Sequence, residues 1–200
     1  MIAAAALVLS GLVATSQASA QGGIYIGGSA GNSDISDDVA IPNLITSGTV
    51  DGKDSAFKLY VGYQFNDNFG MDVAYVDLGA ARYSGSYFGT RVTGGSAEVW
   101  GLNFSAVGTL PVGAGFAVFG KLGLFAWEAT AKDTTAGFPF SATENGGDFS
   151  AGVGFSYNFT RNLSARVEWE RFGLGGGGAY DSNVDLGHAD FLSFGMAYRF

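Results

Sequence analysis

The feature that most constrains the fold of this chain is a strict alternation of residue types along its last nine residues. Leu192, Phe194, Met196, Tyr198 and Phe200 are apolar or aromatic, and the residues between them are Ser, Gly, Ala and Arg. This period of two is typical of a β-strand with one apolar and one polar face. A strand that ends on an aromatic residue suits the closing strand of a membrane barrel, with lipid outside and a polar lumen inside.

The same alternation recurs along the chain, and the segments are about as long as a tilted strand needs to cross a bilayer. The clearest are 57–65 and 69–75, which flank the turn Asn66-Asp67-Asn68 and predict a hairpin. The full set of predicted strands is 24–32, 57–65, 69–75, 100–110, 116–130, 149–159, 163–170 and 192–200. The expected fold is therefore all-β: an eight-stranded, antiparallel, up-and-down transmembrane β-barrel.

The connections between these segments alternate between long and short. Long polar stretches occupy 33–54, 80–96, 132–147 and 173–187, whereas the intervening turns have only a few residues. Outer-membrane barrels have short periplasmic turns and long external loops, so both termini are predicted to be periplasmic and the long loops extracellular. Aromatic belts at the two interfaces are then expected from Trp100 and Trp169 on the outer side and from Phe65, Phe69, Phe116, Phe159 and Phe200 on the inner side.

The N-terminal residues 1–20 are predicted to be a secretory signal, and residues 21–200 the barrel domain. An apolar run from Ile2 to Val13 precedes Ala18-Ser19-Ala20, a small-x-small site that predicts cleavage before Gln21. The run is too short for a membrane helix, which needs about 20 apolar residues. It departs from the usual signal in having no Lys or Arg before it.

Three stretches of the chain resemble the transmembrane domain of OmpA-type proteins, within the superfamily of small outer-membrane β-barrels. They read KLYVGYQFNDNFGMDVAYVDLG, FSAGVGFSYNFTRNLSARVEWERFG and FGMAYRF. The resemblance covers 24–200 and implies a role in envelope integrity, adhesion or weak gated conductance. It also implies contact with outer-membrane lipid and lipopolysaccharide. Phe194, Met196, Tyr198 and Phe200 resemble the sorting signal read by the barrel-assembly machinery. The peptidoglycan-binding domain of OmpA proteins has no counterpart in these stretches, so cell-wall anchoring is not carried over.

The predicted inner face carries most of the charge found within the strands. Because a barrel of about eight strands is just wide enough to be filled by side chains, these groups are expected to pair across the lumen and close it. The predicted network consists of Lys58, Asp72, Lys121, Arg166, Glu168, Glu170 and Arg199. The rival interpretation is a secreted, lipocalin-like carrier, which would need the opposite polarity, with apolar side chains inside.

No catalytic residue, cofactor or metal site is predicted. The segment from Gly115 to Leu122 nearly fits a phosphate-binding loop but has Leu122 where Ser or Thr would bind magnesium. His188 is the single His, and Asp190 stands where the His-x-Ser pair of barrel-type lipid A deacylases would have Ser. Zinc sites usually need three or more protein ligands, and the chain has no Cys.

The net charge of −8 makes nucleic acid a poor partner. The acidic loops are best interpreted as solvated, in preference to cation bridges to lipopolysaccharide, and the ligand of the external loops is left open.

Overall fold

The computed structural model describes residues 22–36, 47–87, 90–133, 140–175 and 185–200, and the predicted signal segment lies outside this part of the chain. The described residues form strands connected by tight turns. The strands are β1 (Gly23–Ile35), β2 (Ser47–Asp51), β3 (Lys53–Gln64), β4 (Phe69–Tyr87), β5 (Thr90–Gly113), β6 (Phe116–Asp133), β7 (Phe140–Asn158), β8 (Leu163–Gly175) and β9 (Asp185–Arg199).

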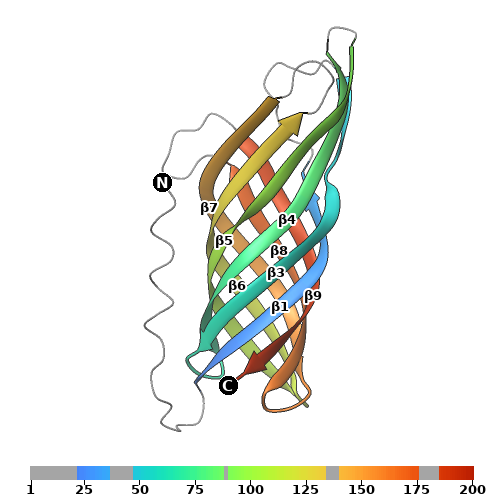
Figure 1. The fold of residues 1–200 in the computed structure, drawn as a ribbon. Coiled ribbons are helices and arrows are strands. Elements are labelled where there is room, and N and C mark those ends of the chain that lie inside the picture. Colours follow the sequence, from blue (N-terminus) through green and yellow to red (C-terminus); the bar gives the residue numbers. More distant parts are fainter. Residues whose placement is uncertain (1–21, 37–46, 88–89, 134–139, 176–184) are drawn as a thin grey trace.

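Eight of these strands close into an antiparallel barrel (Figure 1), which confirms the predicted fold class. The order around the wall is β4-β3-β1-β9-β8-β7-β6-β5, and pairing of β5 with β4 closes the circle. The predicted C-terminal strand lies between β1 and β8, and its Phe194 faces Ala30 on β1 and Val167 on β8. The last strand therefore completes the ladder on both of its edges.

The strands extend well beyond the segments predicted from alternation, so the expectation of long loops at 80–96 and 132–147 is wrong for most of their length. β4 and β5 remain paired as far as Tyr87 and Thr90, and β6 and β7 as far as Asp133 and Phe140. β2 is a ninth strand that pairs only with the far part of β4. The backbone ladder continues there without apolar alternation, and Figure 1 shows the β4–β5 hairpin projecting past the barrel wall.

The opposite end of the barrel has three tight turns, and we call it the short-turn end. The turn between β5 and β6 places Gly113, Ala114 and Gly115 in the left-handed region, with φ of 100°, 53° and 83°. Glycine adopts such angles without steric cost, which explains two glycines within three residues. The turn before β4 is held by Asn66, whose side chain accepts hydrogen bonds from the backbone of Asn68 and Phe69, both at 2.9 Å.

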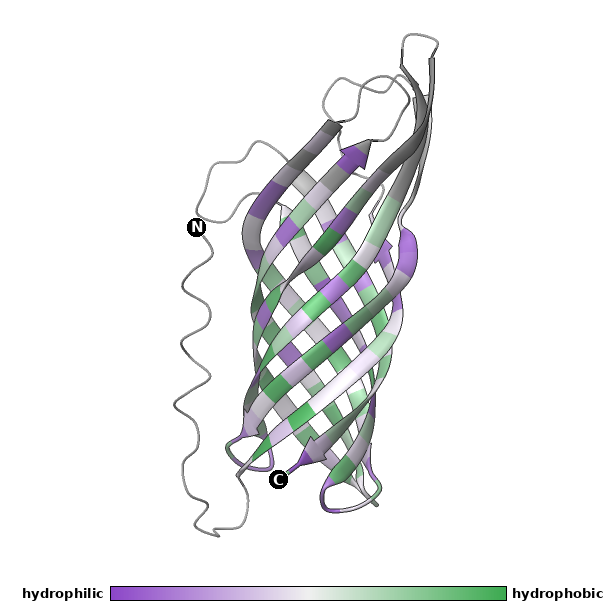
Figure 2. Cartoon of the chain, viewed as in Figure 1, coloured by the Kyte–Doolittle hydropathy of each residue, from purple (hydrophilic) through white to green (hydrophobic). Residues whose placement is uncertain are grey.

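The polarity of the wall is the reverse of that of a soluble protein. Leu59, Leu122 and Phe149 expose 58, 72 and 77 % of their surface, whereas the Lys58 side chain beside Leu59 is fully buried inside the barrel. Figure 2 shows this alternation of hydrophobic and hydrophilic positions along the strands. The apolar outer wall argues against the lipocalin-like alternative, which requires a polar exterior. Among the described residues no helix is long and apolar enough to cross a membrane.

Two tyrosines pack against glycines where β1 meets β3. Tyr25 pairs with Gly62 in the ladder, and Gly27 pairs with Tyr60. A Cβ atom at Gly62 would overlap the Tyr25 ring, and one at Gly27 would overlap the Tyr60 ring. The two rings meet edge to face, with centroids 6.2 Å apart. The absence of two side chains thus makes room for two aromatic rings inside the barrel.

Candidate functional site in the barrel interior

Five charged side chains meet at the middle of the lumen, and we call them the charge network. Lys58 comes from β3, Asp72 from β4, Lys121 from β6, and Glu168 and Glu170 from β8. Each occupies an inward position of its strand, because successive side chains point to opposite faces. The structure therefore brings together residues that are up to 112 positions apart in the chain.

The contacts within the charge network are short, and all five side chains are at most 2 % exposed. Lys58 Nζ donates to Glu168 Oε2 at 2.7 Å and also to Glu170. Lys121 Nζ lies 3.0 Å from Asp72 Oδ2 and 2.8 Å from Glu168 Oε1. The Lys121 contacts are ion pairs by distance but lack hydrogen-bond alignment. Lys58 is thus the better-bonded of the two cations.

Aromatic rings flank this network. Tyr60 lies 5.8 Å from Lys58 Nζ and 5.7 Å from Lys121 Nζ, measured to the ring centroid, and Phe191 lies 5.9 Å from Lys58 Nζ. Rings at these distances attract a cation through their quadrupole. The two lysines are therefore held both by carboxylates and by ring faces.

Arg166 was predicted to pair within the network, but the structure gives it different neighbours. Its guanidinium carbon lies 4.7 Å from the Tyr60 ring centroid, 5.1 Å from that of Phe119 and 5.8 Å from that of Tyr25. No carboxylate of the described residues lies within ion-pair distance of it. The guanidinium is enclosed by three aromatic side chains, because these inward residues of β1, β3 and β6 lie between the network and the short-turn end.

Arg199 also lies outside the charge network. Its side chain is exposed at the short-turn end and lines a cavity there together with Arg166. Among the described residues it forms no ion pair with Asp72, Glu168 or Glu170. The inward parity of Arg199 could be read from the sequence, but its position at the last turn of the barrel puts it too far from the middle layer.

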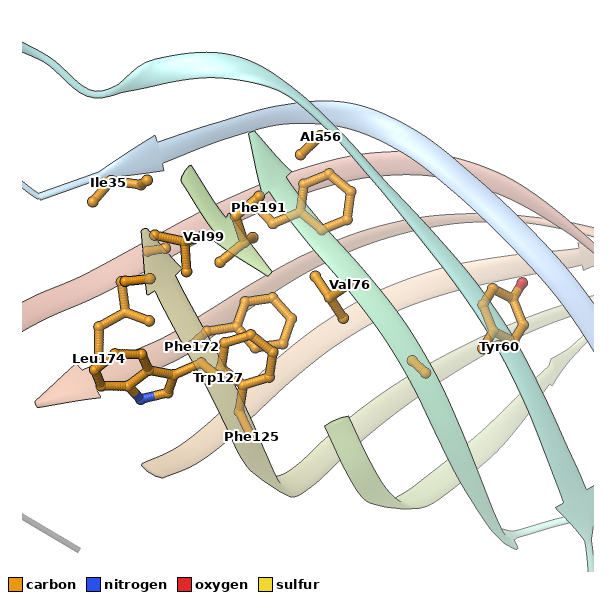
Figure 3. Close-up of a cluster of buried hydrophobic side chains, with 14 of the residues drawn as sticks. Ile35, Ala56, Tyr60, Val76, Val99, Phe125, Trp127, Phe172, Leu174 and Phe191 are labelled. Atoms are coloured by element: carbon orange, nitrogen blue, oxygen red, sulfur yellow. The ribbon is translucent and has the colours of Figure 1, made fainter. Parts of the chain in front are cut away.

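The predicted polar lumen is only part of the interior, because an apolar cluster fills the region next to the long connections. We call it the apolar plug. Phe125 and Phe172 meet at its centre with ring centroids 4.7 Å apart, and Figure 3 shows Trp127 and Leu174 beside them. The main members are Ile35, Val76, Leu78, Val99, Phe125, Trp127, Phe172, Leu174 and Phe191. The alternation of residues predicts the inward position of Phe125, which shares the parity of Lys121, and Trp127 has the same parity.

A small polar cluster that the residue alternation does not predict also lines the lumen wall. Ser150 on β7 donates to Asn103 Oδ1 at 2.7 Å, and Asn103 on β5 donates to Ser105 at 3.0 Å. All three are buried. The strands that carry them, β5 and β7, flank β6 with its Lys121, and Ser105 pairs with Asp72 of β4 in the ladder. A barrel of this size has little room beside the charge network, and these side chains are short.

On the outer surface, the predicted interface aromatics fall into two groups. Phe65, Phe69, Phe116, Phe159 and Phe200 lie in or beside the short turns and the C-terminal end, all with exposed side chains. Nearer the long connections, Trp100 packs on Tyr75 with ring centroids 5.8 Å apart. Trp169 pairs with Val153 and Leu192 in the ladder, and the guanidinium carbon of Arg171 lies 5.5 Å from its ring centroid. Phe194, Met196, Tyr198 and Phe200 all point outward, with 46 to 70 % of their surface exposed.

His188 and Asp190 form no metal site with other described residues. His188 Nε2 lies 3.9 Å from Asp190 Oδ2, but Asp190 accepts two hydrogen bonds from Arg171, each 2.8 Å long. Within the described part of the chain, no group of three or more His, Cys, Asp or Glu side chains is placed to hold a metal. The Arg171–Asp190 pair is an ordinary surface ion pair.

An apolar outer wall, two aromatic zones and a packed interior define a transmembrane β-barrel of the outer-membrane class. A sequence model described as the outer membrane protein beta-barrel domain matches residues 2–200. The chain belongs to this family, and it is an OmpA-type β-barrel of the outer membrane.

Curated relatives support this assignment. Outer membrane protein A of Serratia marcescens is 28 % identical over 144 residues, which are 70 % of this chain and 38 % of the relative. The protein of the same name from Yersinia pseudotuberculosis serotype I (strain IP32953) is 27 % identical, over 98 % of this chain and 54 % of the relative. The chain thus spans about two fifths to one half of the length of these relatives.

Solved structures show the same fold at low sequence identity. OprG from Pseudomonas aeruginosa has a TM-score of 0.62 at 19 % identity, over 90 % of this chain and 96 % of that one. Neisserial surface protein A has a TM-score of 0.57 at 12 % identity, over 88 % and 97 %. Ail, the attachment invasion locus protein of Yersinia pestis, has a TM-score of 0.52 at 17 % identity, over 90 % and 98 %, in complex with the heparin analogue sucrose octasulfate.

Proposed function

We propose that this barrel has a structural or surface-interaction role in the outer membrane, in envelope integrity or adhesion, and that its lumen does not conduct solutes freely. The observation that carries the proposal is the packing of the lumen. The charge network crosses its middle at no more than 2 % exposure, and the apolar plug fills the part above it. Both layers would have to open for a solute to pass.

Planar-bilayer recording of the purified protein tests the closed lumen. Wild type is expected to give no stable open state. Glu168→Gln disturbs the charge network but leaves the apolar plug intact. The lumen of this variant should therefore also stay closed to ions. A long-lived ohmic channel in the wild type would contradict the proposal and favour the second candidate function, a weak gated conductance controlled by the charge network.

In the proposed orientation both termini and the short turns face the periplasm, and the long connections face the outside. The asymmetry between the two ends supports this orientation, since outer-membrane barrels have short periplasmic turns. The chain has no Cys, so single cysteines can report the topology. A cysteine at Thr143 on β7 should react with an impermeant maleimide on intact cells, and one at Asn162 in a short turn should react only after lysis. Labelling at position 162 on intact cells, and at position 143 only after lysis, would show that the barrel has the opposite orientation.

The proposed partners are outer-membrane lipid and lipopolysaccharide along the wall, and the barrel-assembly machinery at the C-terminal strand. Deletion of Phe200 should lower the yield of inserted barrel, because it removes the last aromatic of the outward row. Normal outer-membrane yield of the shortened chain, measured by fractionation and heat-dependent gel migration, would argue against recognition of this residue.

A surface-interaction role would depend on the part of the strands that projects past the barrel. Most of the carboxylates of the described residues lie toward this end, and the chain has an overall charge of −8. A polyanion such as the heparin analogue bound to Ail is therefore a poor ligand for this chain, and a cationic or neutral surface is the better expectation. Replacing the projecting part of the β4–β5 hairpin with a short turn should abolish adhesion while leaving the barrel folded. Unchanged adhesion would show that the projecting strands do not carry the interaction.

A further inference from the structure

The short-turn end of the lumen holds a cavity that the charge network and the apolar plug do not account for. Its volume is about 220 Å³, and its lining includes Arg166, Arg199, Gln64 and Asn158. A second space of about 40 Å³ adjoins it and is lined by Arg161 together with Arg166 and Arg199. Three arginines therefore converge on one mouth of an acidic protein.

Arg166 lies at the inner end of this cavity, and some of its hydrogen-bond donors have no partner in the described part of the chain. Its Nε and Nη1 atoms are buried without a partner among the described residues. A guanidinium has five N–H donors and no acceptor, and its flanking groups are ring faces of Tyr25, Tyr60 and Phe119. Buried donors in native proteins are nearly always hydrogen-bonded, so this group calls for acceptor oxygens.

The charge of the residues that line the two cavities also favours an anionic ligand. The charge network has two ammonium groups against three carboxylates, and its surplus of one negative charge can balance Arg166 at longer range. Arg199 and Arg161 then remain as surplus cations, and of the residues lining the two cavities only Asp67 is acidic.

The mouth is also built with a fixed frame. Asn162 Nδ2 donates to the carbonyl of Arg199 at 2.6 Å, and the Arg199 backbone N–H donates to the carbonyl of Asn162 at 2.7 Å. These two bonds tie the strand end that carries Arg199 to the turn that carries Arg161. The two exposed arginines thus belong to neighbouring backbone segments, and both line the smaller space together with Arg166.

We propose that this mouth binds a small oxyanion, a phosphate or carboxylate group, with Arg166 at the inner end and Arg199 and Arg161 at the rim. Arginine pairs with such groups through two parallel hydrogen bonds. The cavity is smaller than the roughly 300–1,000 Å³ typical of drug-sized ligands, yet far larger than the space one water needs. It suits a single anionic group, either free or on a lipid headgroup. This site goes beyond the proposed structural role and does not depend on it.

Titration calorimetry with inorganic phosphate tests the site, using the whole barrel in a detergent without phosphate groups. Wild type should bind saturably. Arg199→Gln should weaken binding about tenfold or more, since a hydrogen bond to a charged group is worth about 1.5–3 kcal/mol. Arg199 is exposed at the end of the last strand, so this variant should fold. Arg171→Gln is the matched control, because Arg171 is an exposed arginine at the other end of the barrel, and it should bind as wild type does.

Arg166→Lys separates charge from geometry at the inner end. It keeps the positive charge but loses the planar fork, so phosphate binding should weaken while the gel migration of the folded barrel is retained. If wild type shows no saturable binding of phosphate or of acetate, or if Arg199→Gln binds as tightly as wild type, the proposal is wrong. The arginines are then simply hydrated.

The source of the anionic group is decided by a second comparison. Glycerol phosphate has the headgroup without acyl chains, and short-chain phosphatidylglycerol has both. Tighter binding of the lipid than of glycerol phosphate, lost in Arg199→Gln, assigns the site to a lipid headgroup. Equal binding of the two assigns it to free anions, and both outcomes support an oxyanion site.

Discussion

The charge network and the apolar plug are both buried in one lumen, but the first closes it with ion pairs and the second with apolar packing. β8 contributes to both: Glu168 and Glu170 face the network, and Phe172 and Leu174 face the plug four residues further on. Ion pairs depend on which groups are present and how they are aligned, whereas apolar packing depends mainly on filled volume. The middle layer should therefore tolerate few substitutions, and the plug should tolerate any that keep its volume.

The largest effect is expected when a network carboxylate is neutralised. Glu168 contacts both lysines of the network, at 2.7 and 2.8 Å. Glu168→Gln keeps the shape but removes the carboxylate that contacts both lysines, and the interior then has three cations, with Arg166, for two carboxylates. Breaking a buried pair in this way costs about 3–5 kcal/mol. Urea unfolding in lipid vesicles measures the loss. Stability within error of wild type would mean that lumen water solvates these charges one by one.

A charge on the opposite face of the same wall should cost somewhat less. Val61 lies on β3, three residues beyond Lys58, with 39 % of its surface exposed outside the barrel. Val61→Arg places a cation against lipid with no partner, which costs about 2–4 kcal/mol near the bilayer midplane. Lys58 is the internal reference, because there a cation is stable. Equal folding of Val61→Arg and wild type in bilayers would refute the outward assignment of this position.

A volume-conserving change in the plug should have a smaller effect. Leu174 is fully buried in the plug, and Leu174→Met keeps its volume and apolar character. Such substitutions usually cost less than about 1.5 kcal/mol. The unfolding free energy of this variant, measured beside Glu168→Gln, compares the two layers directly. A loss as large as that of Glu168→Gln would show that the plug is as specific as the network.

The smallest effect is expected for an ion pair outside the lumen. Lys132 Nζ donates to Glu98 Oε2 at 3.0 Å, but both side chains are about half exposed. Exposed pairs are worth about 0–1 kcal/mol, so Glu98→Gln should leave the unfolding midpoint almost unchanged. This variant is the control for Glu168→Gln, since both lose one carboxylate bonded to a lysine.

The alternation of residues predicted the eight wall strands and which side chains point inward. It could not predict how far the strands extend, because beyond the apolar zone the ladder is held by backbone hydrogen bonds that any residue can make. Among the site residues, parity placed Lys58, Asp72 and Lys121 on the inner face. It could not separate them from Arg166, whose aromatic neighbours come from β1, β3 and β6 and meet only once the barrel closes.

The pairs of tyrosine and glycine between β1 and β3 bear on how the barrel selects one register during assembly. A slip of one residue turns every side chain to the wrong face, so the apolar pattern alone rejects it. A slip of two residues keeps each side chain on its correct face, so the apolar pattern does not reject it. In one direction it would set Tyr25 opposite Tyr60 in place of Gly62, forcing two large rings into the space of one. In the other direction it would set Gly27 opposite Gly62 and leave a void. The two glycines thus disfavour registers shifted by two residues, which the apolar pattern alone would allow.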